Sequence, residues 1–427
     1  MLLILRVIYI CLVISTITFA LIKKKNLSFL VVYLLSSILF YFNAISGDIY
    51  VGKLNQIGVG YYPIYYGSYI VLIANLIVTW FFLFIEPEKE DYRLKTSLKS
   101  EDLVMKIFVV AVILLSAYMC IRFNVTNRSS FDKHELADDS GSLGTYYKYL
   151  ASFTFVYVFS FDDHKVSWFW KIAGSIPIFS TFLFGNRSYL VISLVAVLFE
   201  MIYKECRTHA GGLASYLARH KVIVISASIL LFVTLVIKGV TNALFSGKIE
   251  LVVSRLTSID YYKQVFFVSE PNSIMTNLNT IVSNHYQIEP SSLIALWAYF
   301  VPFVTRSIEQ FFGVENFAKV YQRVLYVNQT NRAGSYLGEA YANGGYIMVP
   351  VIAAAFIVFL ILIAFAYKRC TSHISKTAFL LIGIDAAFFI QRNSLSFALS
   401  RFRDYIYILI ILIIMNVILS HDHKIRI

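Results

Sequence analysis

Arginine side chains between apolar segments are the residues of this sequence whose chemistry and spacing first suggest a function. The turn Gly185-Asn186-Arg187 connects two apolar segments directly, so two packed helices would hold its guanidinium in place. Arg306 follows another apolar run and would emerge at a membrane surface. A guanidinium binds a phosphate or carboxylate through two parallel hydrogen bonds and keeps its charge. These arginines predict binding of an anionic ligand, with anchoring to lipid headgroups as the alternative.

A second group of arginines precedes the last apolar segment and consists of Arg392, Arg401 and Arg403. Loops on the outer side of a membrane normally carry few arginines, so a group of three there favours a binding role. If this stretch is one helix, Arg392 and Arg403 share a face, because eleven residues are close to three turns. Arg401 would then point elsewhere or pair with Asp404.

Among the acidic residues, Glu339 has the most suggestive position. It lies in the glycine-rich stretch Gly334–Gly345, just before a long apolar segment, where a carboxylate could act as a general base at the bilayer surface. We expect most other acids of the preceding region, which also contains His285, to be solvated or paired. Asp385 lies well inside an apolar segment. It could form a hydrogen bond to a neighbouring helix, or it could relay protons.

The sequence contains none of the common motifs for nucleotide or metal chemistry. There is no glycine-rich phosphate loop followed by lysine, no HExxH and no G-x-S-x-G. The four cysteines are far apart and form no CxxC pair: Cys11, Cys120, Cys206 and Cys370. We therefore predict no cofactor, no metal site and no structural disulfide.

The composition indicates that these residues are positioned by a membrane protein. Hydrophobic residues make up 58% of the 427 residues and charged residues only 15%, against about 25% charged residues in soluble domains. The formal net charge is +12, but the basic residues lie in short loops between apolar runs. Membrane topology explains such an excess, so nucleic-acid binding is not predicted.

Eleven segments are long enough, or nearly long enough, for the roughly 20 apolar residues of a membrane-spanning helix. They are Ile4–Ile22, Leu27–Ile45, Tyr69–Ile85, Ile107–Ile121, Tyr147–Phe161, Val166–Phe184, Tyr189–Tyr203, Val222–Ile237, Tyr346–Tyr367, Thr377–Ile390 and Tyr405–Leu419. With eleven spans, every lysine- and arginine-rich loop falls on one side. That side is the cytoplasm, which places the N-terminus outside and the C-terminus inside.

The prediction is therefore an all-α polytopic membrane protein in three parts. Residues 1–238 form a bundle of about eight spans, residues 239–345 form one large periplasmic loop of short helices, and residues 346–427 form about three spans. Within the loop, the apolar run Ser292–Val304 is too short for a span and fits an interfacial or re-entrant segment.

In this order of features, the sequence resembles the O-antigen, or oligosaccharide repeat-unit, polymerase family. The matching residues are Gly185-Asn186-Arg187, Val301-Pro302 with Arg306, Gly334–Gly345, and Arg392 with Arg401. The resemblance covers nearly the whole chain as a pattern of order and spacing.

The resemblance implies a metal-independent glycosyltransferase of polysaccharide and lipopolysaccharide biosynthesis, at the periplasmic face of the bacterial inner membrane. Such enzymes transfer a growing glycan from undecaprenyl pyrophosphate to the non-reducing end of a new lipid-linked repeat unit. The arginines would stabilise the departing pyrophosphate. The family pattern does not identify the base that helps the attacking hydroxyl, and we choose Glu339 first and His285 second. The partners would be the lipid-linked donor and acceptor and the bilayer, with room for a chain-length regulator protein.

Three alternatives remain at this point. A ligase that attaches finished glycan to a lipid core shares the architecture and differs in its acceptor. A flippase or transporter of lipid-linked oligosaccharides would show repeats and charges at the bilayer midplane. A membrane scaffold without catalytic activity would not need the outward arginines.

Overall fold

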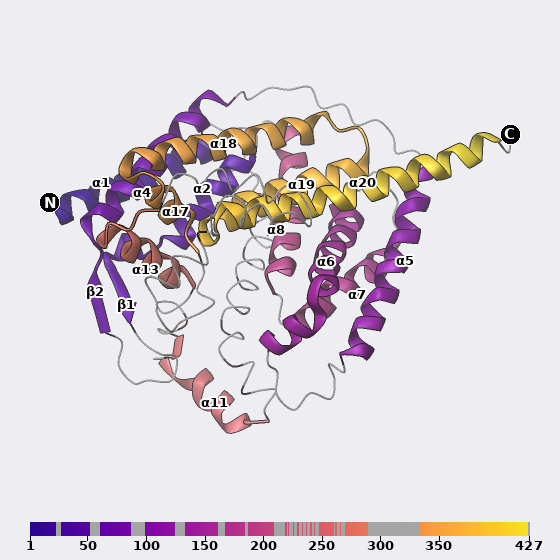
Figure 1. Cartoon of the computed structure of the whole chain (residues 1–427), viewed down its shortest axis with the longest axis horizontal. Coiled ribbons are helices and arrows are strands. Elements are labelled where there is room, and N and C mark those ends of the chain that lie inside the picture. Colours follow the sequence, from indigo (N-terminus) through magenta and orange to yellow (C-terminus); the bar gives the residue numbers. More distant parts are fainter. Residues whose placement is uncertain are drawn as a thin grey trace. The chain divides into compact units, whose positions relative to one another are not determined.

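The structure, a computed structural model, describes most of the chain. The described residues are 1–22, 27–51, 60–86, 99–123, 133–160, 167–183, 187–208, 247–259, 270–288 and 334–425, with isolated positions between 218 and 265 and at 317. These residues are almost entirely helical, with one two-stranded antiparallel sheet (Figure 1). The all-α prediction is therefore confirmed in its main feature, and the sheet is an addition to it.

Among the described residues, six helices are long and apolar enough to cross a membrane, which indicates a multi-pass membrane protein. They are α1 (Leu2–Ile22), α4 (Tyr66–Ile85), α5 (Lys99–Arg122), α18 (Gly345–Arg369), α19 (His373–Phe389, continued by the 3-10 turn η2, Ile390–Arg392) and α20 (Leu395–Ile425). Each contains a predicted span, because the apolar run that partitions into lipid is also the body of the helix.

The other predicted spans differ from their predictions in length. The segment Leu27–Ile45 is divided into α2 (Phe29–Phe40) and α3 (Asn43–Ser46), and the 12 residues of α2 cover only about 18 Å. Helices also occupy three further predicted segments: α6 (Lys133–Ser160), α7 (Trp168–Leu183) and α8 (Arg187–Thr208). The segment Val222–Ile237 lies largely outside the described residues.

Within the predicted outer loop, three helices are described: α11 (Ile249–Thr257), α13 (Glu270–Ser283) and α17 (Tyr336–Ala342). The apolar run Ser292–Val304 lies outside the described residues. The sheet pairs β1 (Asp48–Val51) with β2 (Gly60–Pro63), and Ile49 is opposite Tyr62.

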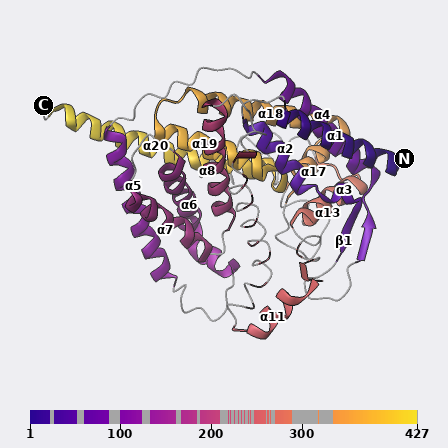
Figure 2. The same cartoon turned by 180° about the vertical axis from the view of Figure 1, so that it is seen from behind.

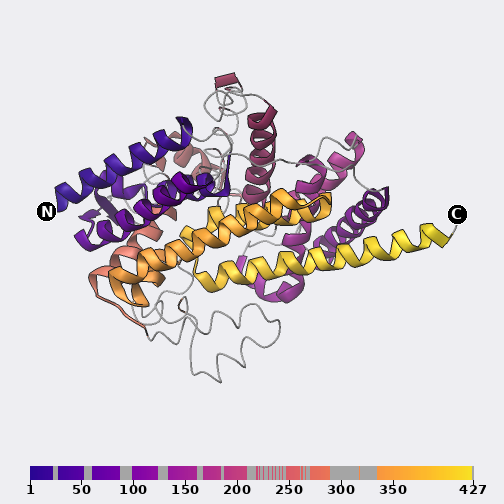
Figure 3. The ribbon, with the colours of Figure 1, turned by 90° about the horizontal axis from the view of Figure 1, so that it is seen from above.

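The chain forms two compact units. Unit 1 contains Met1–Glu88, His209–Ile361 and Ala386–Ser400, and unit 2 contains Lys89–Thr208, Leu362–Asp385 and Arg401–Ile427. In unit 1, α1 and α4 lie side by side (Figure 3), and Phe19 packs against Trp80. Helix α13 lies beside β1 (Figure 1). There the Asn272 side-chain amide donates to the Tyr50 carbonyl and accepts from the Tyr50 N–H. The Asn272 side chain thus forms the two backbone hydrogen bonds that a neighbouring strand would otherwise form with Tyr50.

In unit 2, α6 packs against α5, α7 and α8 (Figure 2). The buried Tyr147 hydroxyl on α6 lies within hydrogen-bonding distance of Ser116 Oγ on α5, at 2.8 Å, and of the Pro177 carbonyl on α7, at 2.9 Å. The bundle core of this unit is thus held by polar contacts as well as by apolar packing, as expected where lipid removes the hydrophobic force between helices.

Candidate functional site

The site is built around α17, a seven-residue helix in unit 1 that lies within the glycine-rich stretch Gly334–Gly345. Ser335 caps its start, because its side chain accepts a hydrogen bond from the Gly338 N–H. Gly334 precedes the cap and lies directly against the backbone before α20, where a Cβ would come within 3.1 Å of the Asn393 carbonyl carbon. A side chain here would crowd that backbone, so glycine favours the close approach that brings α17 to the first turn of α20.

Buried hydrogen bonds fix α17 to α2 and α4. The Tyr336 hydroxyl donates to Asn75 Oδ1 at 2.8 Å, and the Tyr33 hydroxyl donates to the same oxygen at 2.7 Å. The Tyr41 hydroxyl lies 3.0 Å from Ser335 Oγ. Each of these groups would be costly to bury without a partner, so together they define one position for the helix.

Glu339 lies in the middle of α17 and is buried, with 3% of its surface exposed. Its Oε2 accepts a hydrogen bond of 2.6 Å from the Leu395 N–H, the first peptide group of α20. Ser394 precedes this helix, and its carbonyl accepts a hydrogen bond from the Ala398 N–H. Ser394 is therefore the N-cap residue of α20. A peptide N–H and the positive end of a helix dipole both favour the anionic form of the carboxyl group.

Burial has the larger effect on this carboxyl group. Desolvation raises the pKa of Glu339 to about 7, although the Leu395 N–H acts in the opposite direction. Glu339 forms no ion pair with any residue that the structure describes. A carboxyl group with a pKa near neutrality can accept a proton in one step of a reaction and release it in the next.

The structure separates the two residues predicted as general base. His285 is exposed and has a left-handed backbone, with φ of 49°. Its Nδ1 lies 3.3 Å from the Tyr341 hydroxyl. Tyr341 is two residues after Glu339 on α17, and residues two apart point to different sides of a helix. His285 therefore approaches α17 on a different side from the one where Glu339 meets Leu395.

Asp385 forms a buried ion pair in unit 2. Arg401 Nε on α20 lies 2.8 Å from Asp385 Oδ2 on α19, with side-chain exposures of 6% and 4%. The Arg401 guanidinium also lies over the rings of Tyr189, at 4.6 Å from the centroid, and Tyr149, at 5.9 Å. The sequence left two roles open for Asp385, a bond to a neighbouring helix or a proton relay. The structure shows a contact with the neighbouring helix α20, and the partner there is a cation.

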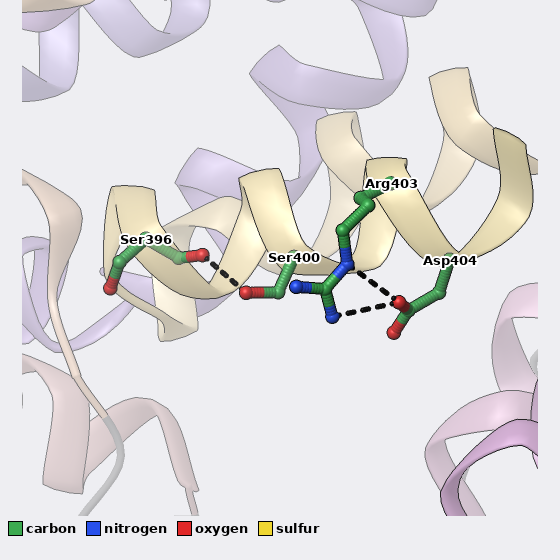
Figure 4. Close-up of polar contacts among 4 residues, drawn as sticks. All are labelled: Ser396, Ser400, Arg403 and Asp404. Atoms are coloured by element: carbon green, nitrogen blue, oxygen red, sulfur yellow. Dashed lines mark hydrogen bonds and ion pairs between the residues drawn. The ribbon is translucent and has the colours of Figure 1, made fainter. Parts of the chain in front are cut away.

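The remaining described arginines lie in different surroundings. Arg403 donates through Nε and Nη2 to Asp404 Oδ1, at 3.0 and 2.9 Å (Figure 4). Arg392 lies over the Phe389 ring at 5.5 Å. The stretch between them is not one helix, because η2 ends at Arg392 and α20 starts at Leu395. The condition for Arg392 and Arg403 to share a helix face is therefore not met, and Asp404 pairs with Arg403 in place of Arg401.

Two predicted residues cannot be placed in a site by their side chains. Arg187 is the first residue of α8, and its side chain lies outside the described atoms; Arg306 lies outside the described residues. Among the residues that the structure describes, no group of three or more histidine, cysteine or acidic side chains could hold a metal ion.

Sequence reasoning did not identify Leu395, whose N–H contacts Glu339, nor the tyrosines around Arg401. Ser394 stands before an apolar run, which is a common helix-start signal, and it could have indicated that the Leu395 N–H is a free donor at the start of a helix. Comparisons of the chain with known protein families, with characterised proteins and with solved structures find no match.

Proposed function

We propose that this protein is a membrane glycosyltransferase that polymerises lipid-linked oligosaccharide repeat units. The growing glycan would pass from undecaprenyl pyrophosphate to the non-reducing end of a new lipid-linked unit, as the family resemblance implies. The observation that carries the proposal is Glu339, a buried carboxyl group with a pKa of about 7 that is paired with a peptide N–H. It lies outside the apolar helices that are long enough to span a membrane.

In the proposed step, a sugar hydroxyl of the acceptor attacks the anomeric carbon of the donor glycan. The new glycosidic bond forms as the bond from that carbon to the pyrophosphate oxygen breaks. The hydroxyl proton passes to the Glu339 carboxylate, and the leaving group is undecaprenyl pyrophosphate. No nucleotide is consumed, because the donor carries its own activated leaving group.

Pyrophosphate gains charge as it leaves, and guanidinium groups would stabilise it. We propose Arg187, Arg306, Arg392 and Arg403 for this role. Arg401 could contact pyrophosphate only by giving up Asp385, because the two are buried as a pair. We therefore assign Arg401 to holding α20 in position against α19.

The 3% exposure of Glu339 has a consequence for this mechanism. An acceptor hydroxyl can reach the carboxylate only after α17 or the start of α20 has moved. Binding of the acceptor should therefore be coupled to a local change at the Glu339–Leu395 hydrogen bond. Keeping the base buried until then would protect it from water.

The topology belongs to the same proposal. Eleven spans, an outer N-terminus and a cytoplasmic C-terminus would place α17 at the periplasmic face of the bacterial inner membrane. Reporter fusions that are active only outside the cytoplasm test this arrangement when joined after Val51 and after Ile288. Activity at both positions is expected, and inactivity at either one would overturn the proposed sidedness.

The function is tested by reconstituting the purified protein in liposomes with an undecaprenyl-pyrophosphate-linked repeat unit. The expected product is a ladder of longer glycans on the lipid carrier. Transfer of finished glycan to a lipid core without a ladder would identify a ligase instead.

Translocation without chain growth would identify a flippase. One observation favours that second candidate, because Asp385 and Arg401 are charges buried within two candidate spans, where transport proteins place functional charges.

A further inference from the structure

A group of aromatic side chains in unit 1 has no role in the proposed chemistry. It consists of Tyr65, Tyr66, His285, Tyr341 and Tyr346, and we call it the tyrosine patch. The residues come from three parts of the sequence: the start of α4, the turn after α13, and α17 with the start of α18. Tyr66 and His285 are exposed, Tyr65 and Tyr346 are half-buried, and Tyr341 is buried beneath them.

The rings of the patch are in contact and lie at large angles to one another. Tyr65 and Tyr66 have ring centroids 4.3 Å apart with an interplanar angle of 47°, and Tyr65 meets His285 edge-on at 6.3 Å. Tyr341 and Tyr346 lie 5.0 Å apart at 71°. His285 Nδ1 lies 3.3 Å from the Tyr341 hydroxyl, within hydrogen-bonding distance. This contact connects the group of Tyr65, Tyr66 and His285 to the pair of Tyr341 and Tyr346.

The surroundings of Gly67 show that Tyr65 and Tyr346, which lie at the starts of different helices, are adjacent. A Cβ on this residue would collide with the Tyr346 hydroxyl and would come within 2.7 Å of Tyr65 Cε1. The Tyr346 hydroxyl and the Tyr65 ring therefore both lie next to Gly67. Any larger residue at position 67 would push them apart.

The backbone below the patch is held in place. Buried Asn279 on α13 accepts a hydrogen bond from the Tyr65 N–H at 2.7 Å and one from Ser68 Oγ at 3.1 Å. His285 keeps a left-handed backbone, which is uncommon for residues other than glycine and is retained only where the surroundings enforce it. The rings are thus pre-organised.

The chemistry of the patch suits an uncharged ring with many hydroxyl groups. A sugar ring presents a face of C–H bonds that can pack on an aromatic ring, and its equatorial hydroxyls can bond to phenol and imidazole groups at the edge. None of the five residues is lysine or arginine. The patch therefore offers no permanent cation for a lipid phosphate, unlike the aromatic and basic residues that usually anchor helix ends.

We propose that the tyrosine patch is a saccharide subsite that binds one sugar ring of the glycan. The inference rests on the proposed function, since it assigns this subsite to the saccharide substrate of the same protein. Tyr341 links the patch to α17, the helix that carries Glu339. A sugar bound on the patch would contact the helix that must move for the acceptor to reach the carboxylate.

The experiment measures saccharide binding separately from chain growth. The full-length protein is placed in nanodiscs of phosphatidylethanolamine and phosphatidylglycerol. The probe is the soluble oligosaccharide released by mild acid from the lipid-linked fraction of the cells that make the protein. Saturation-transfer NMR then reports which sugar protons contact the protein, and a titration of the signal gives the Kd.

The variants are Tyr66→Leu and His285→Asn. Leucine keeps an apolar side chain at a helix start, and asparagine tolerates the left-handed backbone while removing the ring. Tyr61→Leu is the matched control, because Tyr61 is 72% exposed in the neighbouring strand β2 and takes no part in the patch. We expect Kd to rise about tenfold or more for the two patch variants and to stay unchanged for the control.

Two results would overturn the subsite: no saturation transfer to the wild-type protein, or equal Kd values in all variants. Equal Kd values together with a lower yield of nanodisc incorporation for Tyr66→Leu would identify the patch as a lipid anchor. Failure of the proposed function has a different signature, namely sugar binding that depends on Tyr66 in a protein that forms no glycan ladder.

Discussion

Glu339 in unit 1 and Asp385 in unit 2 are both buried carboxyl groups beside a helix, but their partners differ in charge. Asp385 faces the Arg401 guanidinium, which is itself enclosed by Tyr149 and Tyr189. Glu339 faces the Leu395 N–H, a neutral donor. A paired charge fixes two helices and resists change, because removing either partner leaves the other uncompensated. A carboxyl group held by one peptide N–H can change its protonation state near neutral pH.

The largest effect is expected from breaking the ion pair. Asp385→Asn leaves the Arg401 charge buried without a counter-charge, and we expect a loss of about 3 to 5 kcal/mol of stability. Thermal unfolding of the detergent-purified protein and the yield of folded protein would measure it. The double variant Asp385→Leu with Arg401→Met should recover much of the loss, because it buries no charge.

The same double variant sharpens the comparison. If it folds and still extends glycans, Arg401 has a positioning role. If it folds and makes no product, Arg401 contacts pyrophosphate and our assignment is wrong. An Asp385→Asn protein as stable as the wild type would remove the contrast between the two carboxyl groups.

The next largest effect is expected on activity. Glu339→Gln keeps an acceptor for the Leu395 N–H and the shape of the side chain, but it cannot take up a proton. We expect chain extension to slow by about 100-fold or more, with folded yield unchanged. The rate of ladder formation in liposomes measures it. Tyr61→Leu, whose side chain is 72% exposed, is the control and should extend glycans at the wild-type rate. A large loss of rate at saturating substrate in His285→Asn, with normal activity of Glu339→Gln, would show that His285 is the base.

The pH dependence follows from the pKa of about 7 for Glu339. The base must be deprotonated, so the rate should rise about tenfold per pH unit below pH 7 and level off above it. This rise should be absent from whatever activity remains in Glu339→Gln. A rate that is flat between pH 5 and 8 in the wild type would contradict a base with this pKa.

Stability should respond to pH in the opposite direction. The pKa of this carboxyl group is higher in the folded protein than the usual 4.5, so the folded state binds a proton more tightly than the unfolded state. The contribution to stability is therefore favourable at low pH and is lost as the pH rises through about 7. A lower unfolding temperature at pH 8 than at pH 5.5 is expected, with a smaller difference in Glu339→Gln.

The smallest effect is expected from an exposed ion pair in unit 2. Asp102 and Lys106 lie one turn apart on α5, 2.6 Å from each other, with 43% of each side chain exposed. Asp102→Asn should cost about 0.3 to 0.5 kcal/mol at most, and less in high salt, because water screens the pair. A cost comparable to that of Asp385→Asn would show that burial is not what distinguishes the two pairs.

Much of the helical framework was accessible from the sequence. The six helices that can span a membrane each contain a predicted apolar segment, and Glu339 was selected from its position before α18. The division of Leu27–Ile45 into α2 and α3 was not predicted, since its apolar residues continue through the break at Tyr41. The break between Arg392 and Leu395 was missed as well, although Ser394 is a common helix cap.

The sequence by itself determined that this is a helical membrane protein and where six of its apolar helices lie. That information is local, because partition into lipid is a sum over about 20 neighbouring residues. Only the tertiary structure decided which charges meet. It pairs Asp385 with Arg401, sixteen positions away, and brings Leu395 to Glu339 across 56 positions. Burial and partner set the pKa of a carboxyl group, and both depend on residues that are distant in the chain.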